Sequence, residues 1–145
     1  MRTSTLKTTI YWISTGLLGL DFVVGGAFQV ARSPQAVQGF AHLGYPAYFL
    51  SLLGVWKILG GIALLVPGTP RLKEWAYAGI FFDVTAAVVS VIAVGDGVLP
   101  ALVPLAFVIL TLASWALRPP SRALVLAATP NADRSQLRAS AGAAA

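Results

Sequence analysis

The sequence contains no cysteine, a single histidine (His42) and few charged residues, which make up 10% of its 145 positions. The absence of cysteine excludes disulfides, thiolate metal sites, iron–sulfur clusters and a thiol nucleophile. One histidine cannot supply a bis-histidine haem site or a multi-histidine zinc site. No P-loop and no G-x-G-x-x-G motif is present either. We therefore expect no metal and no cofactor held by this chain alone.

Apolar residues are in excess: 57% of the chain is hydrophobic, and the mean hydropathy is +0.80. Soluble domains average roughly 45–50% apolar and 25% charged residues. Four stretches reach the roughly 20 residues that a membrane-spanning helix needs: 10–31, 47–66, 75–94 and 98–117. The sequence thus predicts an all-α integral membrane protein built as a bundle of four transmembrane helices. A cleaved signal peptide is the competing interpretation of the first stretch, but Asp21 interrupts it and no A-x-A site follows.

The connection between the first two stretches predicts a short interfacial helix over residues 34–43. Ser33 and Pro34 fit the N-cap and the first helical position, and apolar side chains then recur at helical spacing until Gly44. We expect this helix to lie on the outer membrane surface. The tight connection at Gly95–Gly97 makes the third and fourth spans antiparallel neighbours.

The distribution of basic residues predicts the orientation. Eight of the ten Lys and Arg residues lie on one side of the predicted membrane: Arg2, Lys7, Arg71, Lys73, Arg118, Arg122, Arg134 and Arg138. The positive-inside rule then places both termini of this multi-pass cell-membrane protein in the cytoplasm. The net charge of +5 reflects this bias, so no nucleic-acid partner is implied.

We divide the chain into a transmembrane domain over residues 1–117 and a flexible cytoplasmic tail over residues 118–145, which is rich in Ala, Ser, Pro and Arg. An aromatic belt is predicted at the cytoplasmic interface. Its members are Tyr11, Trp12, Trp75, Tyr77 and Trp115. Glu74 is predicted to open the third span, where its charge suits a helix N-terminus.

Three charged residues, Asp21, Lys57 and Asp83, fall near the middle of their predicted spans. A lone charge at the bilayer centre costs at least ~2.5–3.5 kcal/mol, so we expect all three to face inward and to pair. Small residues on the same helical faces favour a close contact between Lys57 and Asp83, with Asp21 nearby. They are Gly54, Gly60 and Gly61 beside Lys57, and Ala76, Gly79, Ala86, Ala87 and Ser90 beside Asp83.

Two acids and one base leave a net charge of −1 if all are ionised. Burial of an uncompensated charge is so costly that we expect one aspartate to hold a proton, or a cationic or hydrogen-bonding ligand to occupy the site. Asp21, Lys57 and Asp83 are therefore the candidate catalytic residues. The competing interpretation is that these charges only fix the register of the bundle.

Three further residues are candidates for ligand binding. Gln29 could reach the outer end of a cavity in the bundle, and Ser90 shares a face with Asp83. His42 lies in the predicted surface helix, where a structural hydrogen bond is the competing role. Asp96 is interpreted as a turn residue, and Trp56 as a side chain that faces lipid or packs.

Several collinear strings resemble DoxX-like membrane proteins over residues 10–117. They are Tyr11-Trp12-Ile13, Thr15-Gly16-Leu17-Leu18, Phe40-Ala41-His42-Leu43-Gly44-Tyr45-Pro46, Lys57-Ile58-Leu59-Gly60, Pro70-Arg71-Leu72-Lys73-Glu74-Trp75-Ala76-Tyr77-Ala78-Gly79, Phe81-Phe82-Asp83 and Ala93-Val94-Gly95-Asp96. The resemblance implies a compact bundle of four transmembrane helices and a link to membrane redox complexes, because the family takes its name from a subunit associated with thiosulfate:quinone oxidoreduction. Two positions depart from the pattern: Gln29 stands where many relatives have a basic residue, and Val91 follows Ser90 where closer relatives often have histidine.

Three hypotheses remain open. The chain is an accessory subunit of a membrane redox system that binds a lipophilic, quinone-like molecule; or it is a membrane-embedded enzyme that acts by acid–base chemistry on a lipophilic substrate; or it is a proton-coupled carrier or structural scaffold. The expected partners are the lipid bilayer, a lipophilic small molecule or quinone, and a membrane redox protein or further copies of the chain.

Overall fold

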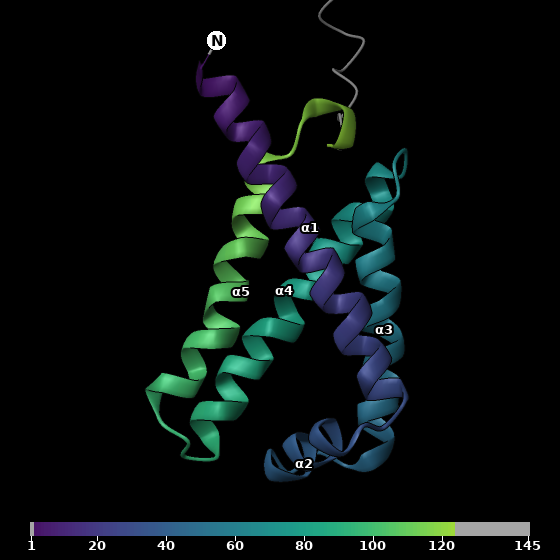
Figure 1. Ribbon diagram of the computed structural model, residues 1–145, viewed down its shortest axis with the longest axis vertical. Coiled ribbons are helices and arrows are strands. Elements are labelled where there is room, and N and C mark those ends of the chain that lie inside the picture. Colours follow the sequence, from purple (N-terminus) through teal and green to yellow (C-terminus); the bar gives the residue numbers. More distant parts are fainter. Residues whose placement is uncertain (1, 124–145) are drawn as a thin grey trace, which may run out of the picture.

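The computed structural model describes residues 2–123, which form five α-helices, one short 3-10 turn and no strand (Figure 1). The predicted tail lies outside the described residues from position 124 onward. In chain order the elements are α1 (Arg2–Val30), α2 (Pro34–His42), α3 (Ala47–Leu65), α4 (Pro70–Ala93), α5 (Val98–Leu117) and the 3-10 turn η1 (Pro120–Arg122).

Helices α1, α3, α4 and α5 are long and apolar enough to cross a membrane, which confirms the four predicted spans and places the protein in a lipid bilayer. The bounds of α5 agree with the prediction. Helices α1 and α4 start earlier, because a helix continues through polar residues that hydropathy assigns to the membrane surface. In α4 the first residue is Pro70, whose missing N–H costs nothing there.

The short helix between the first two spans is confirmed as α2. The side chain of Ser33 accepts a hydrogen bond from the backbone N–H of Ala36 (3.3 Å), and Pro34 follows as the first helical residue. The chain leaves the helix through Gly44, whose φ of +78° favours glycine. No residue of α2 is buried, and the helix lies across one end of the bundle, here called the α2 end (Figure 1).

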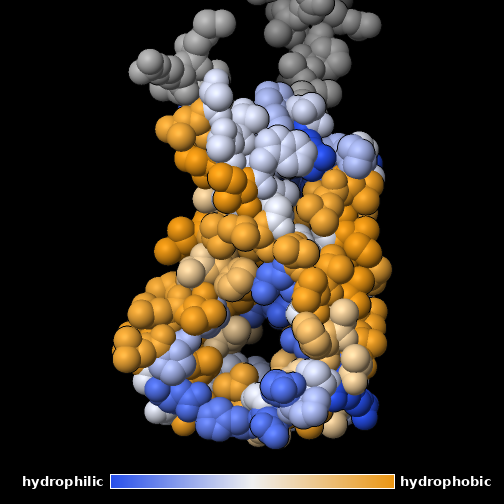
Figure 2. Space-filling model, in the orientation of Figure 1, coloured by the Kyte–Doolittle hydropathy of each residue, from blue (hydrophilic) through white to orange (hydrophobic). Residues whose placement is uncertain are grey.

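The spans form two pairs, α1 with α3 and α4 with α5, and α1 also packs on α5. The two pairs are close together at the end where both the N-terminus and η1 lie, here called the terminal end, and they diverge toward the α2 end (Figure 1). Figure 2 shows a hollow between the diverging halves, above the hydrophilic surface of the α2 end.

Glycines bring α1 and α3 into backbone contact. A Cβ atom on Gly26 would lie 2.7 Å from the carbonyl oxygen of Gly54, and one on Gly61 would lie 2.9 Å from that of Gly19. In each helix the two glycines are seven residues, or about two turns, apart and so share one face. The expectation that Gly54 and Gly61 form a close interface with Asp83 is therefore wrong, because this face of α3 packs against α1.

The last carbonyl groups of α3 lack partners within the helix and are met by cations from elsewhere in the chain. The Nζ of Lys73, whose residue is 1% exposed, donates to the carbonyl oxygens of Ala63 and Leu64 (both 2.8 Å) and to that of Val66. Arg122 also donates to Leu64 O (3.2 Å). Lys73 is thus more than a charge in a connecting loop: it fixes the end of α3 to the start of α4.

A buried hydroxyl network joins three spans in the terminal half. The Oγ of Ser114 lies 2.6 Å from Thr15 Oγ1 and 2.8 Å from the hydroxyl of Tyr77, which links α5 to α1 and α4. Tyr77 and Tyr11 are 4% and 1% exposed, so the prediction that they belong to an interfacial belt is wrong. The three tryptophans predicted for the belt, Trp12, Trp75 and Trp115, are exposed.

The glycine contact gives the first prediction. Gly26→Ala should destabilise the protein by about 1–3 kcal/mol, because the added methyl meets a backbone oxygen that cannot rotate away. Gly25→Ala is the matched control, since nothing lies within 4 Å of a Cβ there. Thermal unfolding of both variants in detergent checks this. Equal melting temperatures would show that α1 and α3 do not pack through this glycine.

The second prediction concerns the end of α3. Lys73→Met should lower the free energy of unfolding by several kcal/mol, because each buried carbonyl left without a partner costs about 1–3 kcal/mol. Arg71→Met, on the exposed surface two residues earlier, should change it by less than about 0.5 kcal/mol. Thermal unfolding in detergent measures both. A Lys73→Met variant as stable as Arg71→Met would contradict the capping role.

Candidate functional site

Lys57 and Asp83 form an ion pair midway along α3 and α4. The Nζ of Lys57 lies 3.5 Å from Oδ2 of Asp83, and the two side chains are 17% and 15% exposed. This contact confirms the predicted pairing. The Nζ of Lys57 also lies 4.8 Å from the centre of the Phe22 ring on α1, close enough for a cation–π interaction.

The position of Lys57 follows from the glycine packing of α3. Lys57 lies between Gly54 and Gly61 in sequence, and at about 100° per residue it is offset by roughly 40–60° from the face that contacts α1. This offset directs the side chain past α1 toward α4. Contact between α3 and α4 is sparser than contact between α1 and α3, so space remains beside the ion pair.

That space is a cavity of about 430 Å³ between α3 and α4, within the roughly 300–1,000 Å³ typical of small-molecule sites. Lys57 and Asp83 are its charged lining residues. Every other lining residue is apolar or aromatic, and Phe22 is the one that α1 contributes. Trp56 and Trp75, which are 64% and 81% exposed, line its outer edge.

Asp21 is the third charge, and it is placed differently from the other two. It is exposed, and within residues 2–123 it makes no hydrogen bond or ion pair. Its carboxylate is nevertheless near enough to interact electrostatically with both Lys57 and Asp83. The three predicted charges are therefore gathered in one region, with one acid paired and the other free.

The three predicted ligand-binding residues lie elsewhere, and none of them lines this cavity. The Nε2 of His42 lies 2.8 Å from Oδ1 of Asp96, and the Oγ of Ser90 lies 2.7 Å from the hydroxyl of Tyr45. Both contacts join the α2 region to the end of α4. The side-chain oxygen of Gln29 is buried and has no hydrogen-bond partner within the described residues.

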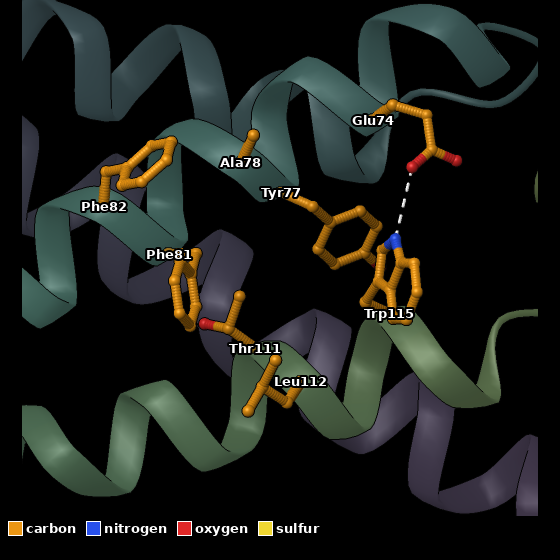
Figure 3. Close-up of a pocket in the computed structure, with 8 residues that line it drawn as sticks. All are labelled: Glu74, Tyr77, Ala78, Phe81, Phe82, Thr111, Leu112 and Trp115. Carbon is orange, nitrogen blue, oxygen red and sulfur yellow. Dashed lines mark hydrogen bonds between the residues drawn. The ribbon is translucent and has the colours of Figure 1, made fainter.

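A second cavity, of about 300 Å³, lies between α4 and α5 (Figure 3). Its one charged residue, Glu74, accepts a hydrogen bond from the indole of Trp115 (3.2 Å) and pairs with Arg118 (2.6 Å). Glu74 thus links α4 to the end of α5, and the prediction that it opens a helix is wrong because α4 starts at Pro70. Because the carboxylate of Glu74 is already bound, this cavity presents fewer polar groups to a ligand than the α3–α4 cavity does.

The family model that matches the chain is that of the DoxX-like family, over residues 13–114. The chain belongs to the DoxX-like family. The matched region contains Asp21, Lys57 and Asp83, so the whole charged cluster lies within the part of the chain that defines the family. Comparison with curated proteins and with solved structures found no match.

Several residues of this DoxX-like protein line the cavity or join helices although the sequence did not predict these roles. Phe22 lines the cavity beside Lys57, and Trp56, expected to face lipid or to pack, also borders the cavity. The Thr15–Ser114 contact could have been found, because a hydroxyl in an apolar span commonly marks a helix interface. Within residues 2–123 no group of three or more His, Cys, Asp or Glu side chains is placed to hold a metal.

The third prediction tests the ion pair. Lys57→Met and Asp83→Asn should each lower the melting temperature in detergent, because removing one partner of a buried pair typically costs ~3–5 kcal/mol. The double variant Lys57→Met with Asp83→Leu should recover much of this loss, since replacing both partners by apolar groups is often neutral.

The control for this cycle is Asp96→Asn, which removes the exposed partner of His42 and should cost under about 1 kcal/mol. Single variants as stable as the wild type would show that Lys57 and Asp83 do not depend on each other.

Proposed function

We propose that this DoxX-like protein binds a lipophilic molecule of the quinone class in the α3–α4 cavity and serves a membrane redox system as an accessory subunit. The observation that carries the proposal is the lining of the cavity. An apolar and aromatic wall surrounds one ammonium and one carboxylate that face each other. A ring with oxygen substituents matches both parts of this lining.

The two charges suit the oxidised form of such a ring, which carries carbonyl groups, and the reduced form, which carries hydroxyl groups. An ammonium group has three N–H donors and a carboxylate has only acceptors. Lys57 can therefore donate to a carbonyl oxygen, while Asp83 can accept from a hydroxyl group. The faces of Phe22 and of the tryptophans at the edge supply apolar contact for the ring.

Entry from the bilayer is consistent with the position of the cavity. Its outer edge is formed by Trp56 and Trp75, whose side chains are exposed on helices that cross the membrane. A lipophilic molecule could pass between α3 and α4 without crossing water.

We also propose that both termini lie in the cytoplasm, because basic residues are in excess at the terminal end.

Asp21 favours a second candidate function, a membrane enzyme that acts by acid–base chemistry on a lipophilic substrate. A free carboxylate beside a lysine–aspartate pair puts two acids in unlike surroundings, which is the arrangement that such chemistry uses. Turnover of a lipophilic substrate by the purified protein without any partner would favour this function over the accessory role.

The fourth prediction is a binding experiment. Purified protein in mild detergent should bind a benzoquinone with a short alkyl chain saturably in equilibrium dialysis. The double variant Lys57→Met with Asp83→Leu should weaken this binding at least tenfold, because both polar anchors are lost. The matched control, Glu74→Gln with Arg118→Met, removes the ion pair beside the other cavity and should bind as the wild type does. Equal binding by all three proteins would reject the α3–α4 cavity as the site.

A further inference from the structure

Asp21 is an exposed carboxylate within a helix that crosses the membrane. A charge facing hydrocarbon near the bilayer centre costs at least ~2.5–3.5 kcal/mol, and such groups normally face the protein interior or a water-filled cavity. No hydrogen bond or ion pair holds this carboxylate within the described residues. Its exposed surface therefore requires water.

The burial of one face of α1 changes at Asp21. Ser14 and Leu18, which precede it on that face by seven and three residues, are 3% and 0% exposed. Gly25, four residues after it, is only partly buried, and Phe28, seven residues after it, is 58% exposed. Helix α5 packs on α1 near the terminal end and diverges from it toward the α2 end (Figure 1). The exposed fractions along this face place Asp21 at the change from covered to uncovered.

Where the two helix pairs diverge, Figure 2 shows a hollow between them with hydrophilic residues along its edge. Lys57 on α3 and Asp83 on α4 lie near enough to Asp21 on α1 to interact with it electrostatically, so both helix pairs carry charge near this carboxylate. At the α2 end, the polar contacts of His42 with Asp96 and of Tyr45 with Ser90 join the two sides. Polar groups thus occur both beside Asp21 and at the α2 end.

We propose that this hollow is a water-filled vestibule and that Asp21 is its proton-binding group, which takes up a proton from water at the α2 end and releases it there. In this exchange the carboxylate gains a proton from hydronium and becomes a neutral acid. The titratable groups that share the space are Lys57 on α3, Asp83 on α4, and His42, Tyr45 and Asp96 at the outer end. The proposal does not depend on which molecule occupies the α3–α4 cavity.

The natural absence of cysteine allows a direct test of water access in the full chain. Asp21→Cys is reconstituted into vesicles and exposed, from each side in turn, to a charged, membrane-impermeant methanethiosulfonate. The depth-matched control is Leu20→Cys. Leu20 is next to Asp21 in sequence, is 61% exposed and lies on another face of α1. His42→Cys on α2 reports which side of the vesicle carries the α2 end.

We expect Asp21→Cys to react at least tenfold faster than Leu20→Cys, and only from the side on which His42→Cys reacts. Gly25→Cys, one turn farther along the same face, should behave in the same way and serves if Asp21→Cys does not fold. Reaction no faster than that of Leu20→Cys, or reaction from the opposite side, would overturn the vestibule.

Proton binding is measured separately by infrared titration of the carboxylic acid band. Asp21→Asn should remove one titrating carboxyl signal, whereas Asp83→Asn should leave the signal of Asp21 present. A spectrum unchanged by Asp21→Asn would show that another group holds the proton. Because quinone binding and water access are read by different experiments, failure of the binding proposal would leave this result intact, and the reverse also holds.

Discussion

Charges in the middle of a bilayer must be paired or hydrated, and this constraint explains most of the arrangement around Lys57, Asp83 and Asp21. Lys57 and Asp83 meet it by pairing across α3 and α4. Asp21, in the vestibule that we propose, meets it by facing water between the helix pairs rather than the lipid. The ion pair needs only that α3 and α4 be neighbours, whereas hydration of Asp21 needs a bundle that is open along part of its length.

The helices can diverge toward the α2 end because buried hydrogen bonds hold them together at the terminal end. There the Thr15–Ser114–Tyr77 network and the contacts of Lys73 are buried. A hydrogen bond in the protein interior is electrostatically stronger than one in water, because the local dielectric constant is lower. At the α2 end the corresponding contact, between His42 and Asp96, is exposed and contributes little to stability. Buried polar contacts are therefore concentrated at the terminal end, while at the α2 end the two sides are joined by the contacts of His42 with Asp96 and of Tyr45 with Ser90.

The spans, the surface helix and the Lys57–Asp83 contact could be predicted because each depends on local signals: apolar length, capping residues and the cost of a buried charge. The helix partners could not. Gly54 and Gly61 are equally suited to contact α1 or α4, and nothing in the sequence of α3 states which neighbour comes closer. The roles of Lys73 and Tyr77 could not be predicted for a related reason: a basic or aromatic residue at a membrane boundary is usually exposed.

The choice of partner for α3 also decides where a ligand can bind. Had the glycines of α3 packed on α4, the two backbones would have closed the space beside Lys57. Because they pack on α1 instead, contact between α3 and α4 is sparser, which leaves the cavity bounded by Trp56 and Trp75. Residues that touch neither charge thus create the site, and the spacing of glycines on α1 and α3 matters to its chemistry as much as the charges themselves.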